Sequence, residues 1–547
     1  MAATPAVADD ATPGMTTVQK ITLIATGLGL FMIFLDALIV NVALPDIQER
    51  FQVGESGLQW VVTAYSLCMA IFIMSGATVA DLKGRKRVFL LGVVVFTLAS
   101  AACGLAPDLA FLNVSRGIQG AAAAVANVTS LALVSAAFPD PKAKAKAIGL
   151  WTAIASVAIA VGPTLGGLLT DTIGWRSIFL VNLPVGLVAC VLTWRFIEES
   201  RDPTGRGIDL PGQLLFAVTV GAFAYAVIEG PQSGWLSPAI VSLFAVAVVG
   251  FIAFVAVEHR VDDPMMDLTL FRDRTYSVAI ATIFIQFFCV YGMLLVVTQY
   301  LQNIRAYSPI AAGLLLLPFS LGIIVFSPIA GRVVAKVGSR QPILVGVSSI
   351  VLGLVLIAVG VSVTTVLVAV GLFFVGFAGA FCLTPITTLA MTSVPAERAG
   401  MASGIMSAQR AIGSTVGFAV LGSILAAWLS ATLPSDLTPI VPDPTERAAV
   451  ADAIIDGADP NAYIAEIGPG RPVPSASSAD EAEITAAADD DFVQGIQLGL
   501  AVAITLSSAA LVACWRWLPR GHQTLAEAQT EATSLEDEEA HRLDDVT

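Results

Sequence analysis

One carboxylate lies inside the first long apolar stretch of the chain. Residues 21–43 read ITLIATGLGLFMIFLDALIVNVA, with Asp36 as the acid among them. A helix of this length would cross a hydrocarbon core of ~30 Å and hold Asp36 roughly 22 Å from its start. Because a charge at that depth costs at least ~2.5–3.5 kcal/mol, we expect Asp36 to face a cavity or a partner and to be a functional residue. The alternative is a polar contact that packs two helices together.

Two arginines also fall within apolar stretches. Arg116 lies in segment 109–137, roughly 10 Å below the outer surface, on a helix directed oppositely to that of Asp36. The two residues lie at nearly the same depth, and a pair would offset the cost of each charge, although shared depth does not establish contact. Arg410 lies about 14 Å from the cytoplasmic end of segment 401–430. It either lines a central cavity or bonds helix-end carbonyl groups.

A short basic loop follows the second apolar segment and contains Asp81, Gly84, Arg85 and Lys86. Gly84 suits a tight turn, and Asp81 would pair with a helix end or an arginine in a gate that closes in one conformation. Ordinary basic flanking of a membrane segment explains the loop equally well. A weaker copy without the acid recurs 254 residues later, in 331–340, which indicates two related halves.

Small residues form one face of segment 148–170. Ala158, Gly162 and Gly166 are spaced by four and extended by Gly167, so another helix backbone can approach closely. Pro163 removes a backbone donor and permits a bend. The face is either a moving contact or static packing.

A mixed lining of aromatic, thioether and amide side chains suits a cavity for loosely specified amphiphilic ligands. Helix packing explains such residues at least as often. The candidates are Tyr65, Met69, Gln286, Phe288, Tyr291 and Arg410.

The sequence lacks the usual patterns of an enzyme, an ATPase or a metal site. The six cysteines form no CxxC pair, there are three histidines, and GxxxxGK[ST], HExxH and GxSxG are absent. We therefore expect no metal or other cofactor and no enzymatic activity. If the protein performs an energy-requiring process, an ion gradient is the available energy source.

Apolar composition predicts an all-α polytopic membrane protein with fourteen spans. The chain has 547 residues, of which 56% are hydrophobic and 13% charged. The spans are expected at 21–44, 57–79, 88–106, 109–137, 148–170, 177–197, 210–230, 237–257, 275–299, 310–330, 342–360, 364–392, 401–430 and 493–518.

Charge distribution predicts the orientation. Loops on the side of the termini carry 21 lysines and arginines against five on the other side, so both termini are expected in the cytoplasm and the chain in the plasma membrane. The net charge of −14 arises largely from segment 431–492 and the tail after Arg520, which hold 21 of the 42 acids. We expect both to be solvating, unpacked segments, and we expect no nucleic-acid partner.

Several motifs resemble those of the major facilitator superfamily, specifically its fourteen-span drug:proton antiporters. The departures are Ala77 and Ala158 in place of glycine and Leu82 in place of arginine. Segment 395–430 is similar to a mycobacterial branch that exports spectinomycin and tetracycline. The matching stretches are 35–45, 81–86, 116–120, 162–167 and 175–184.

This resemblance implies two six-helix bundles, two extra central helices and alternating access. The implied domains are a tail (1–19), a bundle (20–200), a linker with two spans (201–274), a second bundle with an extracellular loop at 431–492 (275–518), and an acidic tail (519–547). It also implies Asp36 and Arg116 in proton coupling, the 81–86 loop in gating and the 162–167 glycines in antiport.

The expected function is proton-coupled export of amphiphilic, often cationic drugs by a monomer, with spectinomycin- and tetracycline-like antibiotics as candidate substrates. Three alternatives stay open. In the first, the chain exports an endogenous metabolite, lipid or siderophore. In the second, it is a membrane scaffold or sensor that acts through residues 431–492. In the third, it imports a compound passively. Charges within the bilayer disfavour the scaffold, because a scaffold has no need to bear their cost.

Overall fold

The computed structural model describes residues 15–138, 141–201, 207, 209–261, 264–394, 399–441, 443–455 and 478–519. Within these ranges the regular structure is helical, without β-strands. The α-helices in chain order are α1 (Thr17–Phe51), α2 (Glu55–Lys83), α3 (Arg85–Gly104), α4 (Leu109–Ala137), α5 (Pro141–Thr172), α6 (Ser177–Leu180), α7 (Asn182–Phe196), α8 (Leu210–Ser233), α9 (Pro238–Glu258), α10 (Arg274–Gln299), α11 (Pro309–Leu315), α12 (Leu317–Val337), α13 (Arg340–Val363), α14 (Thr365–Thr392), α15 (Ala399–Asp436), α16 (Pro444–Ile455) and α18 (Ser478–Trp517). A 3₁₀ turn, η1 (Leu268–Arg272), and a π turn, η2 (Tyr300–Ile304), flank α10.

Short polar residues set several helix starts. Thr16 caps α1 in a capping box with Gln19, and the carboxylates of Asp108, Asp209 and Asp273 accept backbone N–H groups at the starts of α4, α8 and α10. Each cap satisfies amide groups that a helix leaves without partners. The predicted N-terminal tail is therefore too long, because α1 begins at Thr17, before residue 20.

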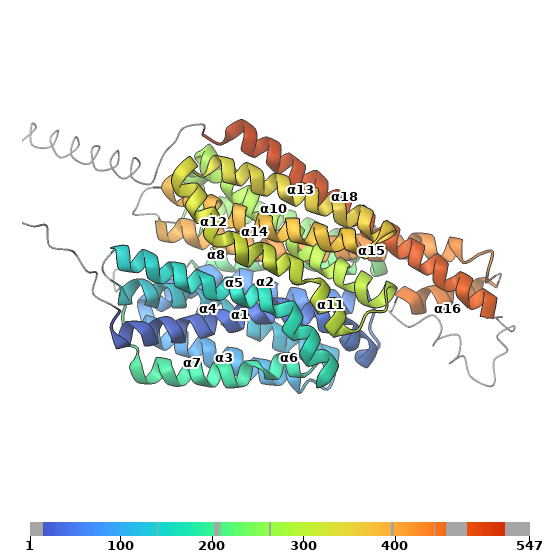
Figure 1. Cartoon of the computed structure of the whole chain (residues 1–547), viewed down its shortest axis with the longest axis horizontal. Coiled ribbons are helices and arrows are strands. Elements are labelled where there is room, and N and C mark those ends of the chain that lie inside the picture. The colour runs from blue at the N-terminus through green and yellow to red at the C-terminus, as the bar shows by residue number, and fades with distance from the viewer. Residues whose placement is uncertain are drawn as a thin grey trace, which may run out of the picture.

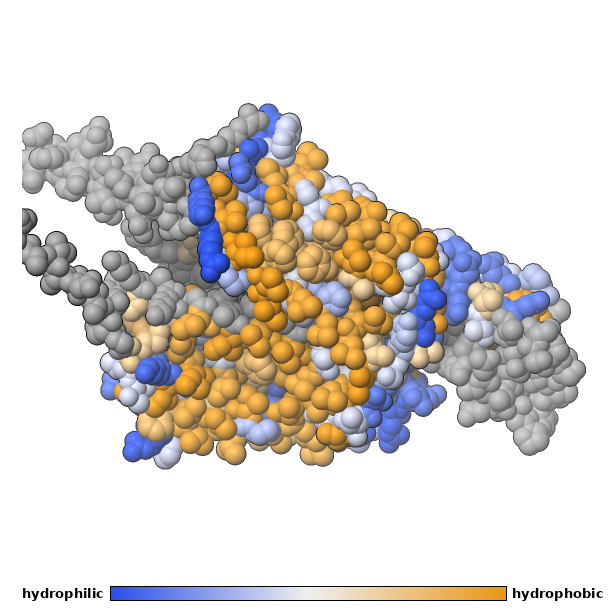
Figure 2. All heavy atoms as spheres, in the orientation of Figure 1, coloured by the Kyte–Doolittle hydropathy of each residue, from blue (hydrophilic) through white to orange (hydrophobic). Residues whose placement is uncertain are grey.

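The long helices form an elongated bundle with an apolar flank. Among the described residues, thirteen helical segments are long and apolar enough to cross a membrane, and α5 contributes the shorter apolar segment Val157–Thr172. The predicted spans correspond to these helices, with α6–α7 and α11–α12 each forming one. Figure 2 shows a broad hydrophobic surface along the bundle, with hydrophilic residues gathered near both ends. This distribution matches a bilayer around the middle.

The start of α1 and the end of α18 lie at the same end of the bundle, on the left in Figure 1. This end is called the termini side, and the opposite end the far side. An even number of crossings gives this arrangement. The assignment of the termini side to the cytoplasm stays a prediction.

Helices α1–α7 pack largely against one another, and so do α10–α15 with α18. The first group is called the N-terminal bundle and the second the C-terminal bundle. Contacts between them run through α2 with α15 and through α5 with α11 and α12. Helices α8 and α9 form a hairpin whose α8 packs against α2 and α15. The predicted domain boundaries near 200 and 274 stay predictions.

The predicted unpacked loop at 431–492 is wrong over most of its described part. Helix α15 continues to Asp436, α16 follows, and α18 begins at Ser478, so a helical extension projects from the far side (Figure 1). Apolar side chains of all three helices and of the turn after α15 form a small buried cluster, because single apolar residues recur at helical spacing within an acidic composition. Its members are Leu433, Leu437, Val441, Val450, Ala451, Ile484 and Ala488. Residues 456–477 and the tail after residue 519 lie outside the described residues.

Candidate functional site

Asp36 lies in the middle of α1, and none of its surface is exposed. One carboxylate oxygen forms an ion pair with Arg116 of α4. The other oxygen accepts hydrogen bonds from the Gln119 amide at 2.8 Å and from the Asn182 amide at 3.0 Å. A negative charge wholly buried at this depth is therefore compensated by one cation and two amide donors.

Arg116 is equally buried, with no exposed surface. Its Nε donates to the Val61 carbonyl oxygen at 2.9 Å, and its Nη1 donates to Gln119 Oε1 at 2.8 Å. The guanidinium carbon lies 4.4 Å from the centre of the Tyr65 ring and 5.6 Å from that of Phe179. Aromatic faces stabilise a cation where water is excluded. The arginine is held from α2, α4 and α6 at once.

The local sequence explains how α4 presents this group. Arg116, Gln119 and Gly120 are spaced i, i+3 and i+4, so they lie on one face of the helix. A side chain at Gly120 would collide with the Tyr65 carbonyl group of α2, so glycine permits the close approach of α2 and α4. This approach brings the Arg116 guanidinium to the α2 backbone.

Two polar residues that complete the site were not among the predicted site residues. Asn182 donates to Ser100 Oγ at 3.0 Å as well as to Asp36, and Ser100 in turn donates to the Phe179 carbonyl oxygen at 2.8 Å. With Gln119, these neutral side chains position the carboxylate. Their signal in the sequence was an amide or a hydroxyl inside an apolar span, which is weaker than that of a charge.

The basic loop between α2 and α3 forms a turn stabilised by charge. Asp81 pairs with Arg85 at 2.8 Å, four residues along, rather than with a distant helix end. Gly84 has φ of +108°, a conformation that favours glycine. Lys86 Nζ donates to the Trp194 carbonyl oxygen at 3.0 Å, which ties the loop to α7.

Glu199, which follows α7, was missed by the sequence reasoning. Its two carboxylate oxygens accept the backbone N–H groups of Lys86 at 3.0 Å and Arg87 at 3.3 Å. The carboxylate therefore caps the start of α3, where the helix dipole favours a negative charge. A side chain at Gly84 would lie 2.7 Å from this carboxyl group, so the turn needs glycine for a second reason.

The glycine face of α5 contacts both bundles. A Cβ at Gly166 would lie 2.8 Å from the Ile39 carbonyl oxygen of α1, within the N-terminal bundle. A Cβ at Gly167 would collide with the Pro309 carbonyl oxygen at the start of α11, in the other bundle. Gly162 is less constrained, since its nearest neighbour would be Leu38 Cβ at 3.2 Å.

A complementary glycine lies on α11. A Cβ at Gly313 would be 2.6 Å from the Pro163 carbonyl oxygen of α5. The Gly313 carbonyl oxygen accepts a hydrogen bond from Thr164 Oγ1 at 3.3 Å. Glycines on both helices thus let the α5 and α11 backbones touch.

Within the part of the chain that the structure describes, the hydrogen bonds between the two bundles lie in the far half of the molecule. The residues lie toward the far-side ends of α1, α2, α5 and α15. The bonds run from Gln302 to the Val42 carbonyl oxygen at 2.9 Å, from Thr164 to Gly313, and from Ser423 to Gln59 Oε1 at 3.3 Å. The bundles are therefore fastened together at the far side.

The predicted cavity residues fall into separate environments. Tyr65 is buried against Arg116 and donates to the Ile33 carbonyl oxygen at 3.1 Å. Met69 is partly buried beside both large core clusters. Phe288 and Tyr291 lie in the α10–α15 interface, and Gln286 is buried on α10. Their assignment to a drug cavity stays a prediction.

Arg410 differs from Arg116 in its surroundings. Its Nη2 donates to the Thr387 hydroxyl of α14 at 3.1 Å, whereas helix-end carbonyl groups were the predicted partners in the packing interpretation. Its Nε is buried without a hydrogen-bond partner among the described residues.

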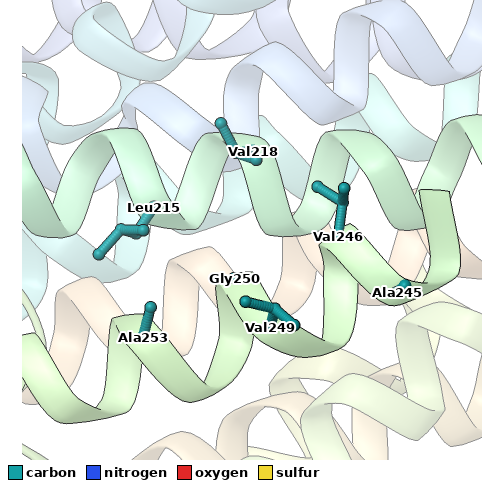
Figure 3. A pocket seen from close by; sticks show the side chains of 7 residues that line it. All are labelled: Leu215, Val218, Ala245, Val246, Val249, Gly250 and Ala253. Atoms are coloured by element: carbon teal, nitrogen blue, oxygen red, sulfur yellow. The ribbon is translucent and has the colours of Figure 1, made fainter. Parts of the chain in front are cut away.

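A separate apolar hollow lies between α8 and α9 (Figure 3). None of its lining side chains carries a polar atom, and none belongs to the predicted cavity. The lining residues are Leu215, Val218, Ala245, Val246, Val249, Gly250 and Ala253. No group of three or more His, Cys, Asp or Glu suited to a metal occurs among the described residues.

The model of the Major Facilitator Superfamily matches residues 26–418. The chain belongs to this superfamily. It is therefore a multi-pass membrane transporter and not an enzyme, as the sequence predicted. The match includes both buried arginines and the glycine face of α5.

Curated relatives are similar over almost the whole chain. The chain is 58% identical to "Multidrug resistance protein Stp" of Mycobacterium tuberculosis, over 93% of its own length and 94% of that protein. It is 44% identical to "Drug efflux pump JefA" of the same species, over 92% and 99%. It is 30% identical to "Tetracenomycin C resistance and export protein" of Streptomyces glaucescens, over 90% of each. The narrower resemblance to a mycobacterial efflux protein is confirmed.

A solved structure supports the fold. The chain is similar to a crystal structure of a bacterial homologue of the human lysosomal transporter Spinster, with a TM-score of 0.60 and 17% identity. The similarity covers 92% of this chain and all of the other. At this identity it establishes the fold alone.

Proposed function

We propose that this transporter exports drugs across the cell membrane in exchange for protons, by alternating access. The observation that carries the proposal is the wholly buried Asp36–Arg116 pair in a chain of this superfamily. The names of the relatives, a multidrug resistance protein, a drug efflux pump and an antibiotic export protein, support drugs as the cargo.

Asp36 is the proton carrier in this mechanism. When it is ionised it holds Arg116, and when it is protonated the ion pair is lost and Arg116 keeps Val61 and Gln119 as partners. The two protonation states therefore stabilise different arrangements of α1, α2 and α4. Because Asp36 has no exposed surface in this conformation, proton exchange requires a rearrangement that opens the site.

The glycine contacts of α5 with α11 supply the moving interface. Breaking the far-side hydrogen bonds between bundles would open that side, while the Asp81–Arg85 pair and Glu199 would hold the α2–α3 loop of the N-terminal bundle in shape on the termini side. The excess of basic residues assigns the termini side to the cytoplasm. The far side is then external, and the protein works as a monomer with protons, the drug and the bilayer as its partners.

Reconstituted vesicles test this function directly. Purified protein is placed in vesicles with a pH-sensitive dye, and tetracycline, spectinomycin or tetracenomycin C is added under a pH gradient. We expect drug to move against its own gradient together with opposite proton movement. Drug transport that persists unchanged after the proton gradient is collapsed would contradict proton coupling.

A further inference from the structure

The C-terminal bundle contains a cation that has no carboxylate close to it in the sequence. Between residues 274 and 430 the one carboxylate is Glu397, which precedes α15 in the chain. Asp36, the acid deep in the other bundle, is already paired with Arg116. Arg410 lies on α15, thirteen residues after Glu397 in the sequence.

The geometry around Arg410 agrees with the sequence. No carboxylate of the described residues lies within 4.0 Å of its guanidinium group, whereas Arg116 meets this criterion with Asp36. Thr387 accepts one hydrogen bond from Nη2, and the buried Nε lacks a partner among the described residues. An arginine stays charged in proteins, so this group holds a positive charge with donor capacity to spare.

Arg410 lies in the termini-side part of the C-terminal bundle. Thr387 lies five residues before the end of α14 at Thr392, about 7 Å along the helix. Side chains lean toward the start of their helix, so the guanidinium of Arg410 lies nearer the termini side than its own Cα. The described hydrogen bonds between bundles lie at the opposite, far side.

We infer that Arg410 and the Thr387 hydroxyl bind an anionic oxygen group of the transported compound, such as a carboxylate or an enolate. The planar guanidinium fork matches two oxygens of such a group, and the partly desolvated site strengthens the attraction. The same charge repels a cationic centre, so among transported drugs this site favours zwitterionic or acidic amphiphiles over purely cationic ones. This inference rests on the proposed export function and specifies its substrate class.

A matched pair of fluorescent probes tests this site. A rhodamine with a free carboxylate and its methyl ester share one ring system and differ in that one charge. Binding to purified protein in detergent is followed by fluorescence anisotropy. We expect wild-type protein to bind the carboxylate at least about tenfold more tightly than the ester, which is the effect of one charge-assisted hydrogen bond.

The variants separate charge from packing. Arg410→Met should remove the preference for the carboxylate, Arg410→Lys should keep part of it, and Thr387→Val should reduce it less than Arg410→Met. Thr387→Asp supplies an internal counter-ion and should remove the preference while Arg410 remains in place. Because it deletes no buried contact of the arginine, it tests the inference even where Arg410→Met fails to fold.

Two results would overturn the inference. One is wild-type protein that does not prefer the carboxylate, including protein that binds neither probe. The other is an undiminished preference in folded Arg410→Met or Thr387→Asp. The assay measures binding without a proton gradient, whereas proton coupling is measured separately as drug-evoked proton movement in vesicles. Failure of proton coupling is therefore distinguishable from failure of this site.

Discussion

Each bundle contains an arginine within its helices, and the two arginines differ in their partners. In the N-terminal bundle Arg116 is wholly buried and held by Asp36, Gln119 and the Val61 carbonyl group. In the C-terminal bundle Arg410 is partly buried and has the Thr387 hydroxyl as its observed partner. The positive charge of Arg116 is neutralised by Asp36, so this ion pair depends on whether Asp36 carries a proton. The positive charge of Arg410 is available to an anionic group of the transported compound.

The termini-side turns of the two bundles share a backbone conformation but differ in the groups that hold them. Gly84 and Gly338 both take positive φ, +108° and +75°, between consecutive helices. The first turn is held by a carboxylate, that of Glu199, whereas Arg340 of the second donates to the Trp515 carbonyl oxygen of α18 at 2.8 Å. Related frameworks thus carry acid–base pairs in the N-terminal bundle, whereas Arg340 and Arg410 of the C-terminal bundle have no carboxylate partner among the described residues.

Removal of Arg116 should have the largest effect on stability. Arg116→Met would leave the Asp36 carboxylate buried without a cation, which costs about 3–5 kcal/mol. Arg410→Met leaves no carboxylate behind and should cost far less. Thermal unfolding of the two variants in detergent measures the difference. Asp36→Asn combined with Arg116→Met should recover part of the loss, and equal destabilisation by the two single arginine variants would contradict the comparison.

The interface between the bundles should be more sensitive than the packing within one. Gly167→Ala places a Cβ against the Pro309 backbone of the other bundle, so the far-side contact must open at a cost of about 1–3 kcal/mol. Gly162→Ala meets Leu38 Cβ at 3.2 Å and should be nearly neutral. Transport per folded molecule should fall several-fold in the first variant alone. Equal activities would mean that α5 and α11 do not form a moving contact.

The carboxylate that caps α3 should have the smallest effect. Glu199→Gln keeps hydrogen-bonding groups but removes the charge at the helix start, which costs about 0.3–1 kcal/mol. Thermal unfolding at low salt should show a small decrease that disappears at high salt. Arg340→Gln is the matched change in the other bundle. A salt-independent loss for Glu199→Gln would indicate that packing and not charge holds the loop.

Hydropathy predicted the fourteen spans and the importance of Asp36 and Arg116, because a charge within an apolar segment is costly and therefore conspicuous. It did not single out Asn182 or Ser100, since neutral polar groups stand out little among apolar residues. Glu199 was missed because an acid just after a span resembles ordinary flanking sequence. Its partners lie on α3, more than a hundred residues away.

The helical extension on the far side was predicted wrongly because composition outweighed spacing. The segment is rich in acids and alanine, yet Ile484 and Ala488 are four residues apart and both are buried. Cavity residues were also difficult to predict. Phe288 and Tyr291 have the chemistry of a drug-binding surface, but the structure packs both against α15.

Drug-evoked proton movement in vesicles containing Asp36→Asn tests the central claim most directly. The substitution keeps the size and hydrogen-bonding capacity of the side chain but removes its titration. We expect uphill drug transport and the accompanying proton movement to fall to the level of empty vesicles, while Asp36→Glu retains part of both. Coupled flux equal to that of wild-type protein in Asp36→Asn would show that the proton travels by another route.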